Sequence, residues 1–237
     1  MISPTIVRLG IRSIFGRRRG LLLVALPVVF IGLAALVRGL VGAEPEAASD
    51  TLEGLGLVVI GPLVALLATT ALLAPEIDDG SISYLLAKPI SRHTIVISKL
   101  AVAASCTVVF AVVPMVFAGL VLLPDEPALA LGFAVGCLVG GAAYCALFAL
   151  LSVITRHAVV IGLIYLLIWE GLLGGLLAGV RWLSITRWAS ALVEPLADVE
   201  LVRLGTIYAV VATLTVICGG TWLTGRRLRA FNLTGDE

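Results

Sequence analysis

Charged residues are scarce in this sequence. Only 13% of its 237 residues are charged, whereas 60% are hydrophobic and the mean hydropathy is +1.15. A water-soluble domain has about 25% charged residues, so this composition excludes an ordinary soluble core. It predicts an all-α integral membrane protein with a single transmembrane domain over residues 1–237. The net charge of +1 gives no reason to expect nucleic acid as a partner.

Motifs for catalysis, metal binding and nucleotide binding are also lacking. The only two lysines, Lys88 and Lys99, lie outside any glycine-rich loop, so the phosphate-binding pattern G-x-x-x-x-G-K-[ST] is absent. There is no Gly-x-Ser-x-Gly and no His-Glu-x-x-His. All four cysteines lie within apolar runs without metal-ligand spacing, so we interpret them as packing residues: Cys106, Cys137, Cys145 and Cys218. We predict no catalytic residue and no metal site.

What the sequence does contain is six apolar runs that predict membrane spans. A helix needs about 20 apolar residues to cross a bilayer, and the runs cover about 21–43, 53–74, 95–123, 128–154, 158–180 and 204–224. The first run is too long for the apolar part of a signal peptide, so we expect it to be retained. Residues 44–50 and 124–127 predict acidic turns, and Pro75 predicts the end of the second span.

Basic residues predict the orientation of these spans. If both termini are cytoplasmic, 12 of the 16 lysines and arginines face the cytoplasm, and four remain outside: Arg38, Arg181, Arg187 and Arg203. This agrees with the excess of positive charge found on cytoplasmic loops. We expect Arg38 to extend to the interface. Residues 2–19 predict either an amphipathic interfacial helix or a plain basic flank.

The segment 181–203, before the last span, is too long for a simple turn. It carries Trp182 and Trp188 among apolar and polar positions. Tryptophans favour the membrane interface, so we expect short outer helices that are interfacial or re-entrant.

Glycines recur every four residues in two of the predicted spans. Small residues at this spacing allow helix backbones to approach closely where the hydrophobic effect cannot drive association. We therefore predict helix-packing seams, within the bundle or between two copies, at Gly132, Gly136 and Gly140 and at Gly171, Gly175 and Gly179.

Glu170 is a carboxylate near the middle of an otherwise apolar run. Such a residue costs about 2.5 kcal/mol or more to insert, so it needs a partner, a proton or a water-lined cavity. Three roles stay open at this stage: a structural hydrogen bond, the lining of a translocation path, or proton coupling.

The longest polar interior stretch runs from Glu76 to Lys99 and reads EIDDGSISYLLAKPISRHTIVISK. Its charges and turn backbone cannot lie unsatisfied in hydrocarbon, so we place it in the cytoplasm between the second and third spans. Gly80 permits a break, Ser81 can cap a short helix, and Pro89 can end it. Between them, Tyr84, Leu85 and Leu86 form an apolar knob.

This stretch resembles the membrane subunits of type-2 ATP-binding-cassette (ABC) transporters. The matching residues are Glu76, Gly80, Ser81, Leu85, Leu86, Pro89, Ser91, Arg92 and Lys99. The family usually has threonine where this chain has Ser81. The order of the spans and the Arg-rich end after the last span are also similar.

The resemblance implies a permease that exports its cargo with energy from a separate ATPase subunit. In such proteins the loop after the second span is a coupling helix that docks on the ATPase. We carry this role to Glu76, Asp79, Gly80, Ser81, Tyr84, Leu85, Leu86, Pro89, Ser91 and Arg92. ATP and Mg would bind the partner, a second permease copy or homologue would complete a dimer, and membrane lipid would surround it. This chain would itself hold no cofactor.

Cargo and location are less directly indicated. The resemblance favours a multi-pass protein of the cell membrane and a drug, antibiotic or other lipophilic cargo, and the preference for arginine over lysine with abundant alanine and glycine indicates a bacterial source. A channel or a non-transporting scaffold subunit is an alternative. A membrane enzyme resembling CDP-alcohol phosphotransferases is a remote one, because Glu76 and Asp79 imitate only part of that motif and no acidic residue follows before Asp125.

Overall fold

The structure, a computed structural model, describes residues 19–78, 92–174, 179–197, 199, 201 and 204–230. Every regular element in these ranges is a helix, which confirms the all-α prediction. Within them, five helical segments are long and apolar enough to cross a membrane: Gly20–Val41, Pro45–Leu73, Thr94–Leu122, Pro127–Ile154 and Thr206–Arg227. The predicted amphipathic helix of residues 2–19 lies outside the described residues except for Arg19.

The first two helical runs form a hairpin whose boundaries differ from the prediction. α2 (Arg19–Val41) is followed by α3 (Pro45–Thr51), the π-helix η1 (Leu52–Ile60) and α4 (Gly61–Asp78). The acidic turn predicted at 44–50 is wrong, because Pro45 starts α3 at a position whose N–H would have no partner anyway. α4 itself continues past Pro75 to Asp78, but the part that could cross a membrane ends at Leu73, close to the span end predicted at Pro75.

The third run is longer than a bilayer is thick. α6 (Arg92–Thr107), the π-helix η2 (Val108–Val112) and α7 (Val113–Leu122) follow one another without a break. A run of this length reaches about 45 Å at about 1.5 Å per residue, as expected for a tilted or projecting span. Pro114 lies two residues after the end of η2, and the wider π turn provides room where proline removes a backbone hydrogen bond.

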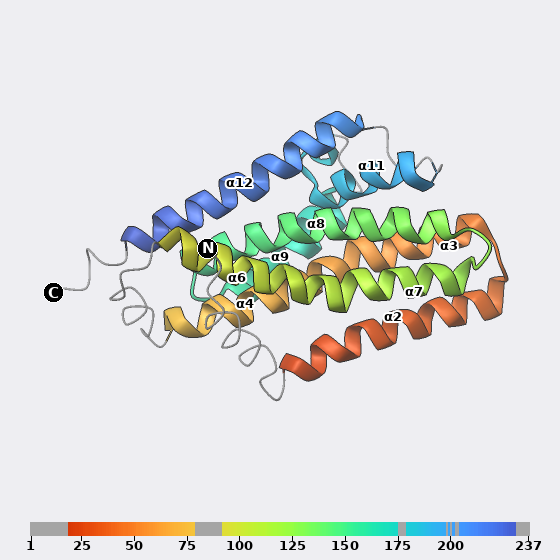
Figure 1. The fold of residues 1–237 in the computed structure, drawn as a ribbon, viewed down its shortest axis with the longest axis horizontal. Helices are drawn as coiled ribbons and strands as arrows, with labels where there is room; N and C mark the ends of the chain where they lie inside the picture. Colours follow the sequence, from red (N-terminus) through yellow and green to blue (C-terminus); the bar gives the residue numbers. More distant parts are fainter. Residues whose placement is uncertain are drawn as a thin grey trace.

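α8 (Pro127–Ile154) is the centre of the bundle (Figure 1). It packs against α4, α7, α11 (Ile185–Ala197) and α12 (Thr206–Ala230). Phe133, Tyr144 and Phe148 on α8 are completely or almost completely buried. Three of the cysteines are buried as expected for packing residues, whereas Cys218 on α12 is exposed.

The region predicted as the fifth span is divided. α9 (Ala158–Ile164) and the π-helix η3 (Tyr165–Leu173) make one apolar helix of 16 residues, which reaches about 24 Å. Val180, the predicted end of the span, instead begins the 3₁₀ helix η4 (Val180–Leu183). α11 follows and packs on α8, so Trp188 is buried while Trp182 is half exposed.

The two ends of the bundle differ in charge. At one end the turns after α2 and α7 carry Glu44, Asp125 and Glu126, and we call it the acidic end. At the other end α2 begins at Arg19, α6 begins at Arg92, α4 finishes, and α12 finishes with Arg226, Arg227 and Arg229, so we call it the basic end (Figure 1). α2 and α12 flank the bundle on opposite sides and expose many apolar side chains, as lipid-facing helices do.

Candidate functional site

The predicted docking segment starts and finishes at the basic end of the bundle. Glu76 belongs to the last turn of α4, and Arg92 is the first residue of α6. The other predicted docking residues lie outside the described residues: Asp79, Gly80, Ser81, Tyr84, Leu85, Leu86, Pro89 and Ser91. The coupling helix therefore stays a prediction.

Lys99 joins the two helices that flank this segment. The side chain of Lys99 is only 5% exposed. Its Nζ donates a hydrogen bond of 3.0 Å to the backbone carbonyl of Leu72 on α4. A buried ammonium group needs such partners, because desolvation disfavours its charge. Lys99 thus connects α4 to α6 through a charged hydrogen bond.

Glu170 belongs to η3 and lies beside the first residues of α11. Its side chain is buried. Oε1 accepts hydrogen bonds from the hydroxyl of Tyr165 at 3.0 Å and from the backbone N–H of Ile185 at 3.0 Å. Oε2 accepts from the hydroxyl of Ser184 and from the N–H of Thr186 at 3.4 Å. Four donors therefore converge on one carboxylate, which we call the Glu170 hub.

The hub satisfies the first N–H groups of α11, which no carbonyl of that helix can reach. Ser184 precedes the helix in an extended conformation and accepts a hydrogen bond from the N–H of Arg187 at 3.2 Å through its hydroxyl. Ile185 and Thr186 donate to Glu170 instead. A negative charge is also favoured at this end by the helix dipole. Glu170 and Ser184 therefore cap α11 together.

A second carboxylate holds α11 from η1. Glu53 Oε1 lies 3.3 Å from Nη1 of Arg187 and accepts a hydrogen bond of 2.8 Å from the hydroxyl of Ser190. Both side chains of the ion pair are partly buried. On the α8 side, the hydroxyls of Tyr144 and Thr186 lie 2.8 Å apart and share a hydrogen bond. Side chains of three different helical runs therefore bind the first half of α11.

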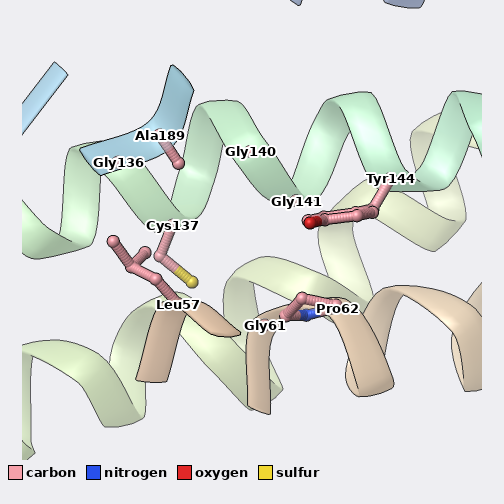
Figure 2. A pocket seen from close by; sticks show the side chains of 9 residues that line it. All are labelled: Leu57, Gly61, Pro62, Gly136, Cys137, Gly140, Gly141, Tyr144 and Ala189. Carbon is pink, nitrogen blue, oxygen red and sulfur yellow. The ribbon is translucent and has the colours of Figure 1, made fainter. Parts of the chain in front are cut away.

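The first glycine stripe lies against α11. A Cβ atom at Gly132 would come within 3.0 Å of Ala197 Cβ, one at Gly136 within 2.8 Å of the Ala189 carbonyl, and one at Gly140 within 2.9 Å of Ala189 Cβ. The two helices approach so closely that a side chain at any of these positions would require α11 or its side chains to shift, most of all at Gly136, where the obstacle is backbone. A cavity of about 10 Å³ remains beside this seam, between α8 and residues 57–62, with Cys137 and Tyr144 directed toward it (Figure 2).

The second glycine stripe has no such neighbour in this chain. A Cβ atom at Gly171 would meet only the carbonyl of Leu166 in its own helix, at 3.5 Å, and one at Gly179 would meet nothing within 4 Å. Gly175 lies outside the described residues. Gly171 and Gly179 therefore form no seam with another described helix of this chain, and the alternative, a seam between two copies, stays a prediction.

Arg38 has a defined partner near the acidic end. Its Nη1 donates a hydrogen bond of 2.8 Å to the carbonyl of Leu122, the last residue of α7. A cation at a helix C-terminus is favoured by the unpaired carbonyls there. The side chain therefore links α2 to α7 instead of only extending to the interface.

Several of these residues were missed from the sequence. Glu53 was treated as the edge of a span and Arg187 as an outer-side charge, although an ionisable residue inside an apolar segment indicates a functional or paired group. That signal could have singled out Glu53. Tyr165 and Ser184 carry no comparable signal, because their partner lies on a different element or several residues away.

These features define a multi-pass, all-helical membrane protein with a polar network around one internal helix. Among the residues that the structure describes, no group of three or more His, Cys, Asp or Glu side chains is placed to hold a metal ion.

The family follows from a comparison with known proteins. Residues 5–220 match the model of the family described as ABC-2 family transporter protein, so the chain belongs to this family and is an ABC-2 type permease. A comparison with curated proteins gives no match. Membrane subunits of this family generally pair with an ATPase subunit, and the family's permease is not itself catalytic.

Proposed function

We propose that the chain is the transmembrane subunit of an ABC exporter and that it docks a separate ATPase through residues 76–92. Membership in the ABC-2 family carries this proposal. The position of the segment supports it, because α4 and α6 deliver it to the basic end of the bundle (Figure 1). The positive-inside rule puts that end in the cytoplasm, where ATP is hydrolysed.

The topology under this proposal has six crossings, of which the fifth is composite. α9 and η3 rise from the basic end as far as the Glu170 hub. α11 then continues from the middle of α8, where Thr186 meets Tyr144, to its acidic end, where Ala197 meets Gly132. α11 is thus the outer half of the fifth crossing. Both termini of the chain then lie in the cytoplasm. We propose that the cell is bacterial.

The cargo pathway is proposed to lie between two permease copies. The cavity beside α8 is too small for any cargo, since about 10 Å³ is the lower limit for one water molecule. Gly171 and Gly179 are free of neighbours from other described helices and suit a seam with a second copy or a homologue. The cargo is proposed to be a drug, antibiotic or other lipophilic compound, and ATP with Mg binds the partner.

Docking is tested by purifying the permease together with a candidate ATPase and measuring ATP hydrolysis and cargo flux in liposomes. Leu85→Asp puts a charge in the proposed apolar knob and is expected to weaken assembly by about 2 kcal/mol or more, as at an interface hot spot. Leu233→Asp, the same substitution in the polar tail, is the control. Unchanged assembly and transport in Leu85→Asp would refute the docking proposal. Flux without ATP would indicate a channel.

A further inference from the structure

The groups that surround Glu170 help to decide between the three roles considered for this residue. All four neighbours, namely the hydroxyls of Tyr165 and Ser184 and the N–H groups of Ile185 and Thr186, donate to it. An ionised carboxylate accepts about four hydrogen bonds and donates none. The acceptor positions of Glu170 are therefore used by donors from the same chain, which favours the structural role over the lining of a translocation path or proton coupling.

The position of the hub also matters. Glu170 lies 12 residues after Ala158, so it is about 18 Å along its helix at about 1.5 Å per residue. At this depth bulk water cannot replace the hub, and an unpaired N–H in hydrocarbon costs several kcal/mol. The start of α11 therefore stays inside the bundle only while an acceptor is present there.

We infer that Glu170 is a positioning residue that keeps the start of α11 inside the membrane bundle by accepting four hydrogen bonds from groups of this chain. Without it, the donors at the start of α11 have no acceptor, and α11 leaves the face of α8 for the outer interface. Its tryptophans and mixed polar and apolar side chains suit that location. Glu170 thus acts through α11 and does not contact the cargo.

The experiment measures how fast a single thiol in α11 reacts with N-ethylmaleimide in native membranes. Val193→Cys is the reporter, because Val193 is fully buried and cysteine is no larger. The four native cysteines are replaced in this background. A second background keeps only Cys145, which is buried on α8, and reports on the rest of the bundle.

Glu170→Gln is the decisive variant, because the amide has nearly the same shape but only one acceptor oxygen and adds two donors. In Glu170→Gln we expect labelling at position 193 to become about tenfold faster or more, as for the loss of charged hydrogen bonds. We expect the same increase in Glu170→Ala. Glu170→Asp keeps the acceptors and should restore much of the protection. Glu126→Gln, at an exposed turn, is the matched control and should change nothing.

Labelling of Cys145 should stay slow in every variant. Protection of position 193 in Glu170→Gln equal to that of the parent would overturn the inference, because a protonated or space-filling residue would then suffice. Faster labelling of both thiols would also overturn it, since the whole bundle would have opened. The measurement needs no ATPase, so its failure leaves the docking proposal standing, and a failure of docking leaves this inference standing.

Discussion

Two glycine stripes with the same four-residue spacing have different surroundings in this molecule. Gly132, Gly136 and Gly140 lie so close to α11 that a side chain there would require α11 or its side chains to shift, whereas Gly171 and Gly179 touch no other described helix. The spacing makes close approach possible, but it does not select the partner. At the first stripe the partner is held in place by the Glu170 hub and by Glu53, both of which bind α11 directly.

The largest effect on the difference between the two glycine stripes is expected from Gly136→Leu. A side chain there would collide with the backbone carbonyl of Ala189 and with Val193, which cannot move without displacing α11. We expect a loss of about 3 kcal/mol in the free energy of unfolding, at the upper end for overpacked cores. Unfolding by SDS in mixed micelles measures it.

Gly179→Leu is the matched control for this prediction, because a Cβ atom at Gly179 meets nothing within 4 Å. An equal loss of stability in both variants would show that the two stripes do not differ.

A smaller effect is expected from Glu53→Gln, which tests the polar contacts beside the first stripe. The amide loses the ion pair with Arg187 but can still accept the hydrogen bond from Ser190 through its oxygen. Partly exposed pairs contribute little, so we expect a loss of about 1 kcal/mol in the same unfolding assay. The pair has no role in holding α11 if Glu53→Gln and Arg187→Gln both leave the unfolding curve unchanged.

The smallest effect is expected from replacing single glycines by alanine, and here the two stripes should differ in sign. Gly179 has ordinary helical backbone angles and open space around it, so Gly179→Ala should stabilise the chain by about 0.5 kcal/mol through the unfolded state. Gly136→Ala should destabilise it, because even one methyl group meets the Ala189 carbonyl. A shift of the same sign in both variants would contradict this interpretation.

Much of the fold was predictable because hydropathy is a local property. The runs at 21–43, 95–123, 128–154 and 204–224 each correspond to a described helix whose ends differ by a few residues. The acidic turn predicted at 44–50 was wrong, since a local turn signal was given more weight than the helix that follows it. The division of the fifth run depends on contacts of η3 with α11, which no window along the sequence contains.

The candidate site was only partly predictable, for a related reason. A carboxylate in hydrocarbon demands partners, and that rule singled out Glu170. Its partners are hydroxyl and backbone groups of common residues, which no composition or motif distinguishes. The pairing of Glu53 with Arg187 joins positions 134 residues apart, so a single sequence does not reveal it.

The buried bond from Lys99 to Leu72 has a mechanical meaning for whatever binds at the basic end. It joins α4 to α6, the two helices on either side of residues 79–91. The bond lies about two turns before the end of α4 and about two turns after the start of α6. Under the proposed docking, a force that the ATPase applies to residues 79–91 would reach α4 and α6 together, because this hydrogen bond ties the two helices to each other.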